Sequence, residues 1–202
     1  MANERKFWYG EVIQAEETGE MNFNYINTRI DTAFNSKCYA TSMKFSDGYT
    51  KTLQENFQKF LADTQNSEEG KQFKWSRNPS LGWSELDDGT VLFKMKSKKR
   101  DKDTKELLKV PLYDSQGNEL DPMINLMTGS KVIPMFQPTV YWTSSKDNGV
   151  TLYLEGLQLI EPKIYNSGAS NKPKFKPVVG GYVAGDTKYE TADEPDEEDC
   201  PV

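Results

Sequence analysis

A run of basic residues is the part of this sequence best suited to binding an anionic ligand. Residues 94–105 contain seven bases against two acids, and Lys94, Lys96 and Lys98 are spaced by two. In a β-strand this spacing places the three ammonium groups on one face, because successive side chains alternate. Such a face, with Arg100 in the turn beyond it, can contact the phosphates of a nucleic acid. Lysines also protect exposed sheet edges from pairing, so a purely structural role stays open.

Aromatic residues beside basic ones suggest a second kind of contact. Trp75 lies close to Arg77 in a polar stretch, and Tyr141 and Trp142 end a strand-like run. Single-stranded nucleic acid is held by bases that stack on such rings, at about 1–3 kcal/mol per base. Adjacent strand residues face opposite sides, so only one of the last two rings can enter a groove unless the strand ends there. The alternative is that the tryptophans fill the core. The candidate DNA-binding residues are Lys94, Lys96, Lys98, Arg100, Trp75, Arg77, Tyr141 and Trp142.

The acidic residues gather at the C-terminus. Residues 186–202 carry eight acids and one base, a net charge of −7, which leaves +1 for the other 185 residues. A polyanionic segment can occupy a basic groove in competition with a nucleic acid, and can bind basic partners once displaced. A solubilising role is the alternative. The candidate tail-interaction residues are Asp193, Glu194, Asp196, Glu197, Glu198 and Asp199.

The sequence contains no histidine. This excludes Ser-His-Asp and Cys-His nucleophile systems and every histidine-ligated metal site. The acidic residues outside the tail are scattered, so we expect neither an enzyme nor a cofactor nor a metal. Cys38 and Cys200 are too few and too far apart for a disulfide framework, which fits a reducing cytoplasm. No apolar run reaches about 18 residues, so we expect no membrane association.

Strand and turn patterns predict a mainly β fold. Strand-like segments lie at residues 22–30, 37–45, 90–98, 105–113, 131–142 and 150–160. The third and fourth resemble a hairpin, and Pro134 and Pro138 argue for an edge strand or a bulge in the fifth. Leu53, Phe57 and Leu61 are spaced by four and predict one amphipathic helix over about 50–64. Five or six strands and one helix suit an OB-fold-like Greek-key barrel.

The chain is expected to have three parts. Residues 1–165 are expected to form an OB-fold domain that carries the candidate single-stranded DNA-binding residues. Residues 166–185 are a Gly/Pro/Lys-rich linker. Residues 186–202 are an acidic tail that cannot bury enough apolar surface to offset the entropy of ordering, so we expect it to be disordered.

The order of these segments resembles the replicative single-stranded DNA-binding proteins of short-tailed bacteriophages. The similar segments are YATSMKF before the helix, DDGTVLFKMK from Asp88, the loop KKRDKDTKE, LLKVPLYDSQGNEL, the GSK that opens the strand ending in Trp142, VTLYLEGLQLIE, and GYVA before the acidic terminus. They span most of residues 37–199. This chain departs from the family at its end, where Cys200-Pro201-Val202 stands in place of an aromatic residue.

The resemblance implies a set of functions and partners. It implies an OB-fold homodimer that binds single-stranded DNA without sequence specificity in phage replication, recombination and repair, within the cytoplasm of the bacterial host. It further implies that the tail contacts the phage DNA polymerase and helicase-primase. It places Lys94 and Lys96 on backbone phosphates and a stacking ring at Tyr141-Trp142. The alternative is a protein-interaction or assembly module on the same barrel, without DNA binding.

Overall fold

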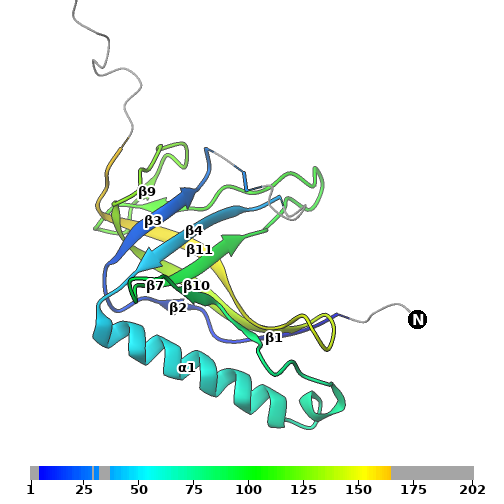
Figure 1. The fold of residues 1–202 in the computed structure, drawn as a ribbon. Helices are drawn as coiled ribbons and strands as arrows, with labels where there is room; N and C mark the ends of the chain where they lie inside the picture. Colours follow the sequence, from blue (N-terminus) through cyan, green and yellow to red (C-terminus); the bar gives the residue numbers. More distant parts are fainter. Residues whose placement is uncertain (1–4, 29, 32–36, 165–202) are drawn as a thin grey trace, which may run out of the picture. The chain divides into compact units, whose positions relative to one another are not determined.

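Five strands close into a barrel in the computed structural model, which describes residues 5–28, 30–31 and 37–164 (Figure 1). They are β3 (Gly19–Tyr25), β4 (Tyr39–Lys44), β7 (Val91–Ser97), β10 (Lys131–Trp142) and β11 (Asn148–Glu161). The pairing runs β3-β4-β7-β11-β10 and returns to β3. The pair β7–β11 is parallel and the other four are antiparallel. This order is that of the OB-fold, so the expected fold class is confirmed.

Large apolar side chains fill the barrel. Phe57 of the helix lies against Phe93 of β7 and Phe136 of β10, with ring centroids 6.2 and 6.1 Å apart and edge-to-face geometry. All three rings are at most 1% exposed. The alternate residues of β7 and β10 therefore point inward, which directs their neighbours to the outer surface.

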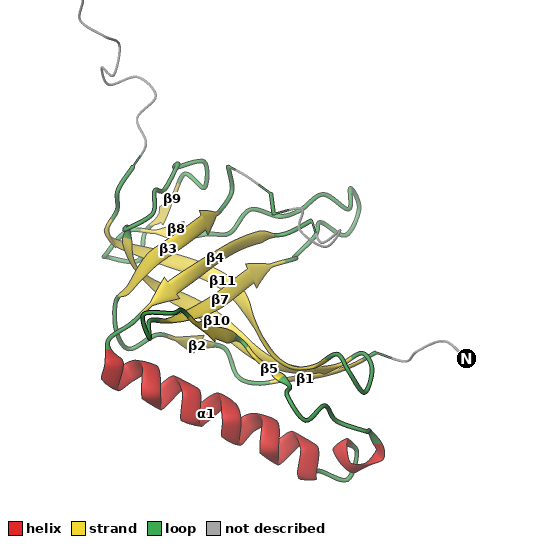
Figure 2. Cartoon of the chain, viewed as in Figure 1, coloured by secondary structure: helices red, strands yellow, loops and turns green. Residues whose placement is uncertain are grey.

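The helix α1 (Asp47–Asn66) covers one end of the barrel (Figure 2). It is longer than the predicted 50–64, and Ser46 caps it. The Ser46 hydroxyl accepts a hydrogen bond from the backbone N–H of Tyr49 at 3.3 Å, which satisfies one of the free donors of the first turn. In the described part of the chain, no helix is long and apolar enough to cross a membrane.

Short strands extend the barrel at its edges. They are β1 (Lys6–Tyr9), β2 (Ile13–Gln14), β5 (Ser80–Leu81), β6 (Trp83–Glu85), β8 (Leu112–Tyr113) and β9 (Glu119–Leu120), with a 3₁₀ turn η2 (Gly70–Gln72). β8 pairs with β11 and β9 instead of β7. The predicted hairpin of 90–98 with 105–113 is therefore wrong, apart from one bridge between Arg100 and Leu107.

The prolines of β10 lie in a central strand. β10 pairs with β11 on one side and with β1, β2 and β3 on the other. The carbonyls of Pro134 and Pro138 accept hydrogen bonds from the N–H groups of Ala15 and Gly10 at 2.9 and 2.8 Å. The register shifts between Met135 and Phe136. Of the two alternatives given by the sequence, a bulge is therefore correct and an edge strand is not.

Candidate nucleic-acid interface

The outer surfaces of β4 and β7 form a wall of a groove on the barrel. Phe93 and Met95 are at most 1% exposed, so Lys94 and Lys96 project from the opposite face of β7. The register places Lys94 beside Ser42 of β4. The groove has a volume of about 460 Å³, and its lining includes Ser42, Ser80, Lys94, Lys96 and Tyr141.

The lysines of β7 differ in their surroundings. Lys94 is exposed, whereas Lys96 is half-buried and its Nζ lies 5.9 Å from the centroid of the Tyr153 ring. Burial lowers the pKa of Lys96, and the charge of Lys98 lowers it further, while Cys38 and Asp147 oppose the shift. A cation held over a ring and partly removed from water gains more from an incoming phosphate than a fully hydrated one. The groove therefore favours anions.

Tyr141 brings an aromatic ring to the same groove. It pairs with Gly149 of β11, and Gly149 also pairs with Ser80 of β5. A Cβ on Gly149 would lie 2.0 Å from the Ser80 carbonyl oxygen, so only glycine lets these strands approach so closely. Burial raises the pKa of the Tyr141 phenol, and the charge of Asp147 adds to this rise. The ring therefore stays neutral at physiological pH and presents a half-buried face.

Trp142 points to the other side of the sheet, as alternation requires. Its ring centroid lies 4.8 Å from that of Phe73, and its indole N–H donates to the Lys74 carbonyl at 3.1 Å. Trp75 packs on Trp8 at 5.7 Å and donates to the Gly70 carbonyl at 2.9 Å. We call Trp8, Phe73, Trp75 and Trp142 the aromatic cluster. The structure thus separates two of the candidate stacking rings, Trp75 and Trp142, from the groove.

The remaining candidates lie around the groove. Lys98 follows β7 and is exposed. Arg77 is exposed, three residues before Ser80. The guanidinium of Arg100 donates to the carbonyl of Lys105 in the loop beyond β7, at 2.9 Å, and to the carbonyl of Lys37, which precedes β4, at 3.4 Å. Their contacts with DNA stay predictions. The tail candidates, the linker and the expected disorder lie outside the described residues.

One aromatic residue of this surface was missed by the sequence interpretation. Tyr153 lies between Leu152 and Leu154, which are at most 1% exposed, so its ring is on the outer face and contacts Lys96. The alternation of apolar residues over 150–154 already indicated that Tyr153 faces away from the core. The parallel pairing of Tyr153 with Lys96, which comes from barrel closure, did not show in the sequence.

Comparison with known proteins supports the fold assignment. Neither a family model nor a curated protein matches the sequence. Among solved structures, gp2.5, a single-stranded DNA-binding protein encoded by bacteriophage T7, aligns over 90% of this chain and 100% of its own with a TM-score of 0.56 and 19% identity. The single-stranded DNA-binding protein of bacteriophage Enc34, in complex with ssDNA, aligns over 75% of this chain and 96% of its own with a TM-score of 0.52 and 9% identity. The expected resemblance is thus confirmed at the level of architecture, and the chain has the fold of these phage proteins.

Proposed function

We propose that the chain is a sequence-independent single-stranded DNA-binding protein that acts in phage DNA replication, recombination and repair. The observation that carries this proposal is the groove, where Lys94 and Lys96 lie beside the half-buried ring of Tyr141. In OB-folds the face of the second and third strands binds oligonucleotides. Here these strands are β4 and β7, which form the groove wall.

The chemistry of the groove favours a single strand and no particular sequence. Lysine ammonium groups contact phosphates, which are the same at every nucleotide. A tyrosine ring stacks on any base, because every base has a π-face. In a duplex both faces of each base are already stacked, so the ring has nothing to bind. Single strands of different sequence should therefore bind alike and duplex DNA should bind weakly.

An oligo-dT titration at two salt concentrations tests this function. If Lys94, Lys96 and Lys98 each neutralise one phosphate, the slope of log K against log salt should be about −2, at about −0.7 per phosphate. Mixed-sequence strands should give similar affinities, and the matching duplex a much lower one. A protein that self-associates with concentration and ignores oligonucleotides would be an assembly module instead.

The acidic tail is proposed to compete with DNA for the groove. Residues 186–202 carry a net charge of −7 and the rest of the chain +1, so the tail carries more net charge than the whole rest of the chain. When DNA displaces it, the tail is available to the phage DNA polymerase and helicase-primase in the cytoplasm of the bacterial host, with the protein acting as a homodimer. The support for this is the charge division and the family resemblance.

Removal of residues 186–202 should tighten oligo-dT binding by about tenfold at low salt, or about 1.4 kcal/mol. The gain should shrink as salt screens both competitors. Fluorescence anisotropy with a labelled oligo-dT measures it. A full-length variant with the eight tail acids changed to Asn or Gln is the matched control and should behave like the truncation. Unchanged or weaker binding by both proteins would contradict competition by the tail.

A further inference from the structure

Strand β1 has one anchored face and one open face. On the anchored face Lys6 Nζ lies 3.5 Å from Glu69 Oε1, and the Trp8 indole N–H donates to Glu69 Oε2 at 2.9 Å. Trp8 also belongs to the aromatic cluster. Phe7 and Tyr9 alternate with these residues and therefore project from the opposite face. The packing of one face thus fixes the direction of the other.

The two rings on the open face are exposed and nearly parallel. Phe7 is 41% exposed and Tyr9 63%, with ring centroids 6.4 Å apart and an angle of 22° between the planes. Exposed aromatic rings of this kind are the groups on which the bases of a single strand stack, at about 1–3 kcal/mol per base. Large exposed aromatic rings cost solubility. Their pairing here is a geometry that suits a planar ligand.

The open face of β1 continues from the groove. Phe7 pairs with Tyr141 and Tyr9 pairs with Thr139 of β10. Tyr141 lines the groove, so the exposed ring of Phe7 lies one strand away from it. Alternating residues on paired strands share a face, which places the rings of β1 and Tyr141 on a common surface.

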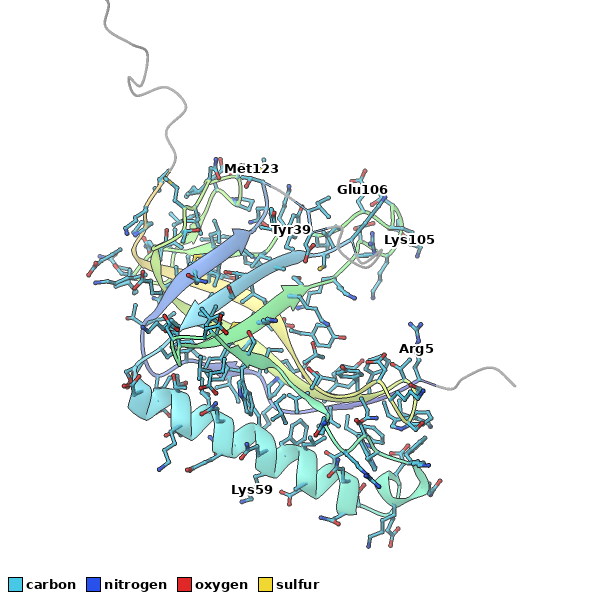
Figure 3. The ribbon with its side chains drawn as sticks, viewed as in Figure 1. Arg5, Tyr39, Lys59, Lys105, Glu106 and Met123 are labelled. Carbon is cyan, nitrogen blue, oxygen red and sulfur yellow. The ribbon has the colours of Figure 1, made fainter. Side chains whose placement is uncertain are left out.

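A second cavity joins β1 to the lysines that follow β7. Its volume is about 280 Å³, and it is lined by residues that include Tyr9, Lys98, Lys99, Gln137, Tyr153 and Glu155. Lys99 forms an ion pair with Glu155. The ammonium group of Lys96 lies over the ring of Tyr153, which lines this cavity. Arg5, directly before β1, projects away from α1 (Figure 3). Cations thus accompany the aromatic rings.

We infer that Phe7 and Tyr9 form a second base-stacking subsite for the same single strand, continuous with the groove through Tyr153. This inference rests on the proposed function. Rings that accept bases need cations nearby for the phosphates between them, and Lys98 and Arg5 provide these charges. The strand β1 then lengthens the DNA footprint beyond the groove formed by the barrel alone.

The test compares binding of an oligo-dT length series by the full chain and by Phe7→Ala/Tyr9→Ala. Short oligonucleotides, which fill only the groove, should bind both proteins alike. The extra affinity that wild type gains with longer oligonucleotides should fall by about 5- to 100-fold in the variant. Phe7→Tyr/Tyr9→Phe keeps both rings and should bind like wild type. Met123→Ala removes an equally exposed apolar side chain (53%) elsewhere and is the matched control.

The outcomes separate the two claims. If wild type binds oligo-dT but the alanine variant matches it at every length, the second subsite is wrong and the proposed function stands. An equal loss at all lengths would place the two rings inside the main groove and also overturn a separate subsite. If wild type binds no oligonucleotide, both claims fall. Matching melting temperatures for all variants show that binding, and not folding, is measured.

Discussion

Lys94→Glu with Lys96→Glu should lower the affinity for every single-stranded sequence by about 100-fold or more at low salt. Two phosphate contacts are lost and two like charges are placed beside the DNA backbone. The salt slope should become shallower by about 1.4, at about 0.7 per contact. Both side chains project outward from β7, so the core residues Phe93 and Met95 keep their packing. A filter-binding or anisotropy titration at several salt concentrations measures both quantities.

The matched control makes the same change of charge on another surface. Lys51 and Lys59 are exposed on α1, and Figure 3 shows Lys59 on the side of the helix away from the barrel. Lys51→Glu/Lys59→Glu should lower the affinity only slightly, through the net charge. If both double variants lose affinity equally, bulk charge holds the DNA and the groove does not. Lys96→Gln, which adds no new charge to the half-buried site, should show an intermediate loss.

The long elements of the fold could be predicted because local pattern decides them. The helix follows from the spacing of Leu53, Phe57 and Leu61, and the long strands β10 and β11 from their length and alternation. The short strands β1, β5 and β8 have two to four residues, too few for a period to emerge. Their pairing depends on barrel closure, which also explains why Leu112 and Tyr113, at the end of the segment 105–113, pair with β11 instead of β7.

The candidate site could likewise be predicted only as far as the local alternation of side chains determines it. Alternation alone placed Lys94 and Lys96 on one face, and the structure has them in one groove. Which aromatic rings join them depends on what packs behind each strand. Segment 70–75 covers the far side of β10 and engages Trp142, and this tertiary contact has no signature in the sequence. The open rings of β1 depend in the same way on Glu69, which lies 61 residues beyond Trp8.

The division of Tyr141 and Trp142 between two faces of one strand predicts opposite effects of truncation. Tyr141→Ala should weaken oligo-dT binding by about 5- to 100-fold, as expected for one lost stacked base at about 1–3 kcal/mol, and should lower the melting temperature no more than Trp142→Ala does. Trp142→Ala should leave binding nearly intact and cost about 2 kcal/mol of stability. This is less than the about 3–5 kcal/mol for a fully buried Trp→Ala change, because the ring is half-buried.

Thermal melts and titrations on the same preparations separate the two roles. For a domain of this size, 2 kcal/mol corresponds to a fall in Tm of about 4–8 °C. Tyr141→Phe keeps the ring, loses only the hydroxyl beside Ser80 and Asp147, and should bind like wild type. The opposite pattern, with Trp142→Ala losing affinity at unchanged Tm, would mean that DNA reaches the aromatic cluster. The binding surface would then lie on the α1 side of β10, and the lysines of β7 would belong to a solvated sheet face.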